Sequence, residues 1–248
     1  MADTAYWKEH SFFRILPKNY ESFELKEDLF YDLNFTGGYD ITSLEYDESV
    51  ETWFVTLDYQ GMQYYAEVFW EDWDWAACYE LEKDIFPDEL RDQIVKGTKT
   101  LTVSMGILGT YAVHGYWLQL QFAHDLVTDM LCLYDESKEH LHTPDWVGKA
   151  VAAQRKFPLN HLFTIHMEVE DEKQETHLTT SGLARFGIDD IEKNVDVVPS
   201  ATNENGEIER IKEHIDQIID QASESLLHQV NAGAFSRMIH PDKLKHIH

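Results

Sequence analysis

The chain has 248 residues, of which 43% are hydrophobic and 13% aromatic, and this is enough apolar material for a buried core. It contains 46 acidic and 20 basic residues, which give a formal net charge of −26. A charge of this sign repels phosphate backbones and anionic lipids, so it argues against sequence-independent nucleic-acid binding and against attachment to an anionic membrane.

The first hundred residues are predicted to be rich in β-strands. Residues 12–34 read as one or two strands. Residues 50–57 and 63–70 alternate as strands do and are separated by a Gln-Gly turn, which predicts an aromatic-rich β-hairpin. Residues 76–96 predict helical structure, and Pro87 followed by two acids is typical of a helix start.

The middle of the chain combines a strand with two helices. Residues 98–107 predict a strand that ends at glycine. Apolar residues recur at spacings of three and four over residues 116–134, which predicts one long helix that is buried on most sides. Residues 144–156 predict a further helix, for which Thr143 is a suitable N-cap.

The last third of the chain ends in a predicted amphipathic helix. Residues 162–169 and 191–198 are rich in β-branched and alternating residues, which predicts two strands. Residues 207–227 carry one apolar stripe and have acids in the first turn, so they predict a helix that packs on a sheet. Residues 231–248 have weaker periodicity, and we expect them to form a partly ordered tail.

Together these elements predict an α+β fold, in which a largely antiparallel sheet is covered by amphipathic helices. One continuous sheet can include the strands of both halves of the chain. The prediction is a single domain over residues 1–230, and the alternatives are a subdivision near residues 106–115 and two similar halves.

The segment from His177 to Glu192 is interpreted as the loop between the last two predicted strands. We expect Gly182 or Gly187 to have a positive φ, because residues with a Cβ resist that conformation. Arg185 lies between the two glycines and is a candidate functional residue, as a positive charge in a strongly negative protein. The alternative is a structural ion pair of this arginine with Asp189, Asp190 or Glu192.

A long segment of the N-terminal half is free of basic residues. Residues 27–82 contain no lysine or arginine, which predicts a strongly negative face. At the end of this segment Trp70, Trp73 and Trp75 alternate with acids, an arrangement that can stack on a sugar or grip a basic partner. These tryptophans and Arg185 are the candidate binding residues. The alternative is that the tryptophans are mostly buried, as large aromatic residues usually are.

The candidates for catalysis lie in and near the same loop. His166 or His177 could act as a base beside Arg185, because histidine titrates near neutral pH. Ser181 is a candidate nucleophile, but the Gly-x-Ser-x-Gly pattern of hydrolases is absent because Thr179 occupies the first glycine position. A structural hydroxyl is therefore the alternative for this serine.

Thirteen histidines raise the question of a metal site. A strand would place His140 and His142 on one face, but they fall between two predicted helices, where we expect them to be solvated. No set of histidines, cysteines and acids has the spacing of a known metal motif. The sequence therefore predicts no metal and no cofactor.

The cysteines and the N-terminal sequence indicate the cellular compartment of the protein. Cys78 and Cys132 form neither a disulfide framework nor a Cys-x-x-Cys pair. The N-terminus lacks a basic and then apolar leader pattern, and no apolar run approaches the roughly 18 residues that suggest a membrane-spanning helix. We therefore expect a cytoplasmic protein that neither crosses a membrane nor binds one.

Residues 117–192 resemble a known kind of protein. They contain Leu-Tyr-Asp-Glu-Ser at 133–137, Leu-Phe-Thr-Ile-His at 162–166 and Ser-Gly-Leu-Ala-Arg-Phe-Gly at 181–187. In these features the chain resembles an uncharacterised bacterial family, a domain of unknown function with a Gly-Leu-x-Arg-x-Gly loop. Members of that kind tend to carry a His-Thr-His-Gly-Leu type sequence where this chain has Thr-Thr-Ser-Gly-Leu at 179–183. The resemblance implies an α+β fold, a bacterial cytoplasmic setting and no established activity.

Two functions follow from these patterns. The first is an interaction module whose acidic N-terminal face meets a basic protein partner, because complementary charge raises encounter rates and selects partners. The second is a hydrolase-like enzyme with its site at residues 177–192, which uses the two histidines and the arginine named above.

Overall fold

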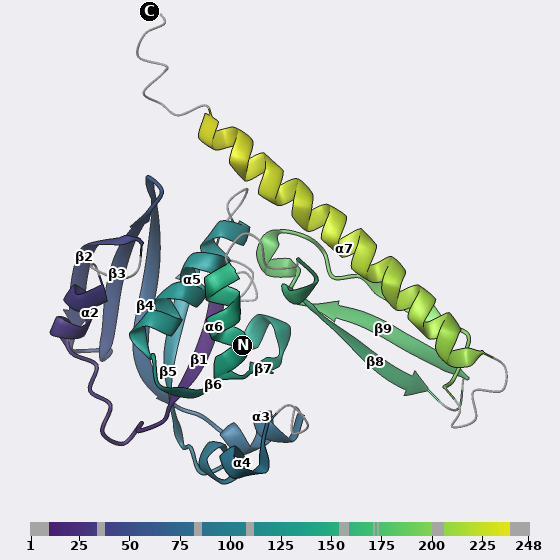
Figure 1. Cartoon of the computed structure of the whole chain (residues 1–248), viewed down its shortest axis with the longest axis horizontal. Coiled ribbons are helices and arrows are strands. Elements are labelled where there is room, and N and C mark those ends of the chain that lie inside the picture. The colour runs from purple at the N-terminus through teal and green to yellow at the C-terminus, as the bar shows by residue number, and fades with distance from the viewer. Residues whose placement is uncertain are drawn as a thin grey trace, which may run out of the picture. The chain divides into compact units, whose positions relative to one another are not determined.

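The computed structural model describes residues 10–33, 38–81, 86–107, 112–153, 159–170, 172, 174–199 and 206–238, without the side chains of residues 80, 81 and 231–238. The chain divides into two compact units (Figure 1). Unit 1 comprises residues 1–107 and 114–157, and unit 2 comprises residues 108–113 and 158–248. The single domain over residues 1–230 stays a prediction.

Unit 1 is built on a seven-stranded sheet in the order β2-β3-β4-β5-β1-β6-β7 (Figure 1). Its strands are β1 (His10–Pro17), β2 (Asp40–Asp47), β3 (Thr52–Tyr59), β4 (Met62–Asp72), β5 (Lys99–Gly106), β6 (Met130–Asp135) and β7 (His140–His142). All neighbouring strands are antiparallel. The predicted α+β class with a largely antiparallel sheet is therefore confirmed. The predicted hairpin is also confirmed, because β3 and β4 pair from Thr52 opposite Phe69 to Tyr59 opposite Met62.

The helices of unit 1 lie on both faces of this sheet. They are α2 (Glu27–Leu33), α3 (Trp75–Leu81), α4 (Asp88–Ile94), α5 (Ala112–Leu126) and α6 (Pro144–Ala153). On one face, the buried amide of Gln119 in α5 donates to the carbonyl oxygens of Ser11 at 2.7 Å and Val103 at 2.9 Å. These bonds attach α5 to the two central strands. Helix α6 begins as predicted, since the Trp146 amide donates to Thr143 Oγ1 at 3.2 Å.

Helices α3 and α4 pack at one end of the other face. Their side chains form an apolar cluster with residues of β1 and β6. The buried members are Leu16, Trp75, Cys78, Tyr79, Phe86, Ile94, Leu131, Cys132, Tyr134 and Leu141. Trp75 and Ile94 have no exposed surface. This cluster fixes the chain after β4 against the sheet.

The single helix predicted over residues 116–134 is wrong. Helix α5 ends at Leu126, and residues 130–135 form β6 between β1 and β7. Every residue of β6 is buried, so the strand is a run of apolar residues up to Tyr134, without the alternation of a half-exposed strand. Such a run continues the apolar pattern of the preceding helix, and no glycine or proline marks the boundary.

Two further expectations need correction. Residues 12–34 are not all extended, because residues 27–33 form α2. The strands do not share one continuous sheet, since β8 (Thr164–Glu170) belongs to a separate three-stranded sheet of unit 2.

Unit 2 is a small sheet covered on one face by a long helix. The sheet has the order β10-β9-β8, with β9 (Glu175–Ser181) between β8 and β10 (Glu192–Val195). Helix α7 (Glu207–Met238) begins where it was predicted. Its apolar stripe packs on the sheet through a cluster of Leu178, Val195, Val197, Ile211 and Ile218. The last residues of the predicted tail, 239–248, lie outside the described residues.

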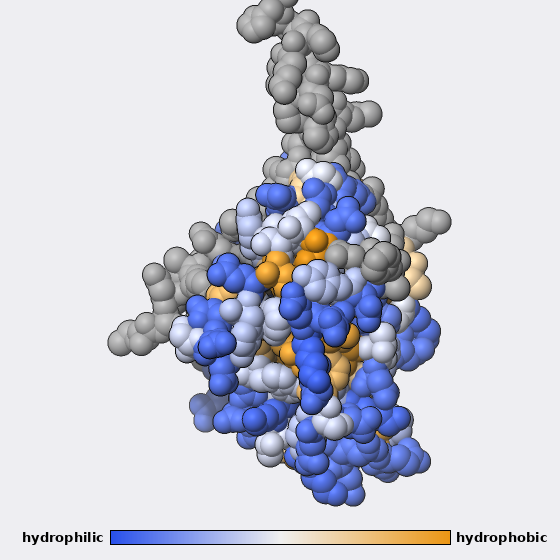
Figure 2. Space-filling model, turned by 90° about the vertical axis from the view of Figure 1, so that its left-hand side faces the viewer, coloured by the Kyte–Doolittle hydropathy of each residue, from blue (hydrophilic) through white to orange (hydrophobic). Residues whose placement is uncertain are grey.

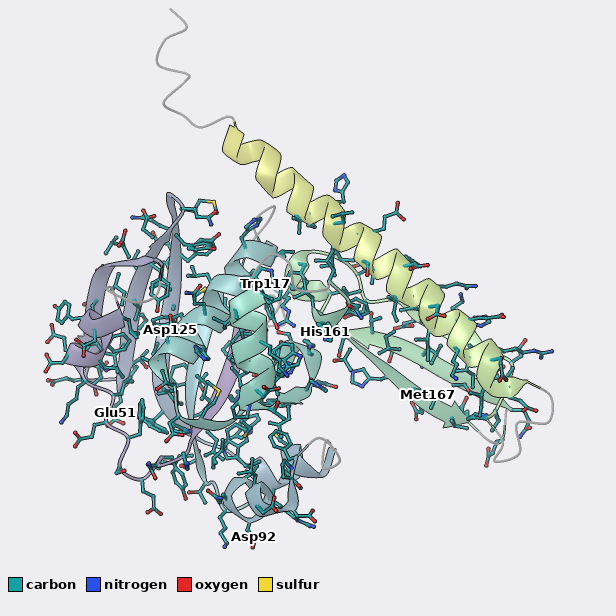
Figure 3. All side chains as sticks on the ribbon, viewed as in Figure 1. Glu51, Asp92, Trp117, Asp125, His161 and Met167 are labelled. Carbon is teal, nitrogen blue, oxygen red and sulfur yellow. The ribbon has the colours of Figure 1, made fainter. Side chains whose placement is uncertain are left out.

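Strand β9 corrects the interpretation of residues 177–192 as one loop. Residues 177–181 are the second half of the central strand, and the connection to β10 is correspondingly shorter. Strand β8 is the edge of this sheet and, among the described strands, pairs with β9 alone. Its Met167, labelled in Figure 3, is 53% exposed, and Val169 is 38% exposed.

The connection after β9 contains the two glycines that were expected to need positive φ. Gly182 has φ 99° and Gly187 has φ 71°, so the expectation is confirmed at both positions. Gly187 ends a short 3₁₀ turn at residues 184–186 in the left-handed conformation.

Gly187→Ala should lower the free energy of unfolding by about 1–2 kcal/mol, because a Cβ strains a left-handed residue. The matched control is Gly148→Ala inside α6, where an added Cβ meets no atom within 4 Å. That change should be neutral or stabilise by up to about 1 kcal/mol. Urea unfolding followed by circular dichroism measures both variants. Equal effects at the two positions would contradict the role given to the positive φ.

Candidate functional site

A cleft of unit 1 lies beside α2. It has a volume of about 530 Å³. Its walls combine aromatic rings with carboxylates, and the lining residues are Glu24, Leu25, Lys26, Glu27, Tyr46, Glu51, Trp53 and Trp70. Figure 2 faces this edge of unit 1 and shows apolar patches set among hydrophilic residues.

The sheet supplies the aromatic wall of the cleft. Tyr46 on β2 pairs with Trp53 on β3, and Trp53 pairs with Val68 on β4. Side chains two residues apart on a strand share a face, so Trp70 lies on the same face as these residues. The Tyr46 and Trp53 ring centroids are 4.9 Å apart, with the rings tilted by 39°. Three neighbouring strands therefore each contribute one aromatic ring to the same face.

The segment before and within α2 supplies the opposite wall. Phe30 has no exposed surface, and its ring lies 5.2 Å from that of Trp53. Phe23 contacts Trp70 edge-on, with ring centroids 6.0 Å apart. These two phenylalanines hold residues 24–27 beside the aromatic rings of the sheet, because each anchors one end of the segment. The cleft is thus formed by packing of this segment on the sheet.

The charges at the cleft are mainly negative. Glu24, Glu27 and Glu51 line it together with one cation, Lys26, which forms an ion pair with Glu24. Tyr31 donates its hydroxyl hydrogen to Glu27 Oε1 at 2.9 Å, and this bond raises the pKa of Tyr31. All three glutamates are exposed, and Glu51 is labelled near α2 in Figure 3. A positively charged ligand would therefore meet a favourable potential at the opening.

The three predicted binding tryptophans lie in different places. Trp70 lines the cleft, but Trp75 has no exposed surface and donates its indole hydrogen to the Lys99 carbonyl oxygen at 2.9 Å. Trp73 packs against Arg14, whose Cζ lies 3.8 Å from the ring centroid. Sequence reasoning missed Tyr46 and Trp53, the other two aromatic residues of the cleft. Their positions on paired strands of a predicted hairpin and its neighbour were the available signal.

The environment of Arg14 is a buried charged cluster. Arg14 Nε lies 3.1 Å from Glu71 Oε1, and its Nη1 forms an ion pair with Glu136. Glu71 also accepts a hydrogen bond from Thr102 Oγ1 at 2.5 Å. Burial lowers the pKa of the Arg14 guanidinium, and the facing Glu71 carboxylate acts in the opposite direction. We interpret this cluster as structural, because its groups satisfy one another.

In unit 2 the two candidate histidines lie on one face of the sheet. His166 pairs with Thr179 across β8 and β9, and His177 pairs with Glu168, so both side chains point away from α7. His166 Nε2 lies 2.7 Å from Ser181 Oγ.

The two histidines have separate surroundings. His177 Nδ1 lies 2.5 Å from Asn194 Oδ1. A depression of about 300 Å³ is lined by Glu168, Glu170, Glu175, His177 and Asn194. This lining includes neither His166 nor the arginine of the following turn, so the three candidate catalytic residues do not share this depression.

Arg185 is a buried residue that donates hydrogen bonds to the backbone around the connection after β9. It is 4% exposed, and it donates to the carbonyl oxygens of Gly182 at 3.2 Å and Leu162 at 3.3 Å. Asp190 accepts hydrogen bonds from Thr180 Oγ1 at 3.1 Å and from the Leu183 amide at 3.3 Å. Desolvation raises the pKa of Asp190, and the nearby Arg185 offsets part of this effect.

Asp190→Asn should stabilise the protein most at neutral pH. Burial raises the folded-state pKa of this carboxyl above its ordinary value of 3.8, so its ionised form costs stability at neutral pH. That cost disappears as the pH falls through the raised pKa to below 3.8. The asparagine oxygen can still accept both hydrogen bonds. Urea unfolding over a pH series should therefore show the two proteins converging toward acid pH, and a constant difference would contradict the assigned cause.

Within the described ranges, no group of three or more histidines, cysteines and acids is arranged to hold a metal ion. His140 and His142 lie on β7, and His142 is 2% exposed and stacked 3.7 Å from the Trp146 ring, so the expectation that both are solvated is wrong. No helix in the described part of the chain is both long and apolar enough to cross a membrane.

The fold and the cleft define an α+β protein whose seven-stranded antiparallel sheet carries an aromatic and acidic cleft. Residues 11–158 match the N-terminal model of a family described as protein of unknown function (DUF4026), and the chain belongs to this family. The match spans more than half of the chain, and its last residue is one residue beyond the end of unit 1. No curated protein sequence matches the chain. No solved structure matches it either.

Proposed function

We propose that the protein is an interaction module that binds a basic protein partner through the acidic face of unit 1. The observation that carries this proposal is the cleft beside α2, where Tyr46, Trp53 and Trp70 share one cavity with three glutamates. Five of its eight lining residues belong to the part of the chain that has no lysine or arginine, residues 27–82, and the other three are Glu24, Leu25 and Lys26. A lysine or arginine side chain of a partner would gain both aromatic contact and charge complementarity there.

The charge of the whole chain supports the same class of partner. A net charge of −26 accelerates encounter with a basic protein and disfavours nucleic acid and anionic lipid. The attraction should weaken as salt is added, because the glutamates of the cleft are exposed and therefore screened.

The proposal is tested by binding of a fluorescein-labelled, lysine-rich peptide, measured by fluorescence anisotropy over a salt series. Replacing Glu24, Glu27 and Glu51 together by glutamine should weaken binding about tenfold, since exposed charges each contribute about 0.2–1 kcal/mol. The control replaces the exposed acids Glu213, Asp216 and Glu224 of α7 by their amides, which changes the net charge equally. Equal loss in both triple variants, or no binding by the unaltered protein, would refute the proposal.

A second candidate function, hydrolysis by the segment 177–192, is favoured by one contact. The 2.7 Å separation of His166 Nε2 and Ser181 Oγ is the distance expected between a base and a nucleophile. A fluorophosphonate probe would then label Ser181, and the label would be lost in His166→Ala. Absence of label on Ser181 in the unaltered protein would remove this candidate.

A cytoplasmic setting is part of the proposal, and a bacterial origin rests on the resemblance of residues 117–192 alone. Cys78 and Cys132 are both buried and free, which suits a reducing compartment. Burial raises the pKa of both thiols, so neither has the exposed, thiolate character of a reactive cysteine.

A further inference from the structure

We infer that the cleft beside α2 is a receptor for an alkylated ammonium group, and that its occupant is a methylated lysine side chain of the partner. The inference rests on the proposed function and specifies which group of the basic partner enters the cleft. Three features of the described residues carry it: the shared face of the aromatic rings, the existing contacts of the glutamates, and the size of the cleft.

The aromatic rings are suited to a cation that is poorly hydrated. Tyr46, Trp53 and Trp70 come from three neighbouring strands and present rings on one face of the sheet. A ring face attracts a cation through its quadrupole, and the attraction is greatest when the cation gives up little hydration. An unmodified lysine ammonium is compact and strongly hydrated, so entering such a site costs it more than it costs a methylated ammonium.

The carboxylates favour a ligand that needs no hydrogen bonds. Two of the three glutamates already have partners, since Glu24 forms an ion pair with Lys26 and Glu27 accepts the hydroxyl hydrogen of Tyr31. They supply negative potential at the opening, but they are not arranged as a free bidentate acceptor of the kind that a guanidinium prefers. A trimethylammonium group has no N–H to satisfy, so contact with the rings costs it no hydrogen bond, whereas a guanidinium exchanges hydrogen bonds to water for the same contact.

The size of the cleft suits a side chain together with its neighbours. Its volume of about 530 Å³ falls in the range of about 300–1,000 Å³ that holds small ligands. Tyr46 is 44% exposed, so the rings can be approached from solvent. The occupant therefore enters as an extended peptide side chain, with flanking basic residues close to the glutamates at the opening.

The test uses the full chain and three peptides of one lysine-rich sequence, which differ only at the central position: lysine, trimethyllysine or arginine. We expect the trimethyllysine peptide to bind about tenfold more tightly than the other two. Tyr46→Ala and Trp70→Ala should abolish this preference. Tyr65→Ala is the matched control, because Tyr65 is 66% exposed and lies on the opposite face of β4 from Trp70. Tetramethylammonium should also compete with the trimethyllysine peptide more strongly than sodium does at the same ionic strength.

The outcomes separate this inference from the proposed function. Equal, salt-sensitive binding of all three peptides would overturn the methylated ligand and leave the basic partner in place. Tightest binding of the arginine peptide would overturn it in favour of a guanidinium ligand. Loss of preference in Tyr65→Ala as well as in the cleft variants would show that the cleft is not the receptor. Failure of every peptide to bind would refute the proposed function itself. Circular dichroism of each variant checks that it is folded.

Discussion

Trp75→Ala is expected to lower the free energy of unfolding of unit 1 by about 3–5 kcal/mol, the range for removal of a buried large aromatic residue. Trp75 has no exposed surface and lies in the apolar cluster under α3 and α4. The substitution also leaves the Lys99 carbonyl oxygen without the indole hydrogen bond of 2.9 Å. Both losses act on the same segment, so α3 should detach from the sheet before the rest of unit 1 unfolds.

The measurement is urea unfolding of the full chain followed by circular dichroism. Trp75→Phe should cost less than Trp75→Ala, because it keeps most of the apolar volume and loses the hydrogen bond. The control is Tyr65→Ala, which removes an aromatic ring that is 66% exposed and should change stability by no more than about 0.5 kcal/mol. If Trp75→Ala were no worse than this control, the cluster under α3 would not be part of the stabilising core.

Arg14→Met should destabilise unit 1 by about 1–3 kcal/mol, which lies between the ranges for exposed and buried ion pairs. Removal of the guanidinium leaves Glu71 and Glu136 without their cation, and it also removes the contact with the Trp73 ring. The cost falls short of that of a fully buried pair because the two glutamate side chains are 31% and 30% exposed and can be reached by water.

A triple variant separates charge from packing at this cluster. Adding Glu71→Gln and Glu136→Gln to Arg14→Met should recover much of the lost stability, because no uncompensated carboxylate then remains. The glutamine oxygen at position 71 can still accept the hydrogen bond from Thr102. Should the triple variant prove as unstable as Arg14→Met alone, the loss would come from packing on Trp73 and not from charge.

The sequence allowed the fold class and the half-exposed strands to be predicted, because their patterns are local. The β3–β4 hairpin has one buried and one more exposed face, so its residues alternate in type. The start of α7 was visible for a similar reason, since its apolar stripe faces a sheet on one side only. In both elements, buried apolar positions and more exposed positions recur at the regular spacing of the strand or helix.

Two strands were missed: β6, which is buried on both faces, and the second half of β9, most of whose residues are polar. All six residues of β6 are buried, so the helix prediction continued through them. Residues 177–181 of β9 alternate between a buried face and a face of histidine and hydroxyl groups, and the polar residues were read as loop. In each case the partner strands, and not the local pattern, determine the conformation.

The cleft could be predicted only in part. The absence of basic residues from 27–82 and the candidacy of Trp70 both point to this region. Its other aromatic walls, Tyr46 and Trp53, depend on the pairing of β2 with β3, and no strand was predicted over residues 40–47. Arg185 was easy to single out in the sequence, because its charge lies between two glycines. In the structure, however, it donates hydrogen bonds to the carbonyl oxygens of Gly182 and Leu162.

The edge strand β8 has a consequence for solutions of high concentration. An open strand that shows apolar side chains such as Met167 and Val169 is a template on which copies of a protein can join into fibres. On β8 these residues alternate with Glu168 and Glu170, which are exposed on the opposite face of the same strand. Two copies brought together edge to edge would therefore confront like charges at close range. We therefore expect the acids of this strand to oppose association of copies at this edge.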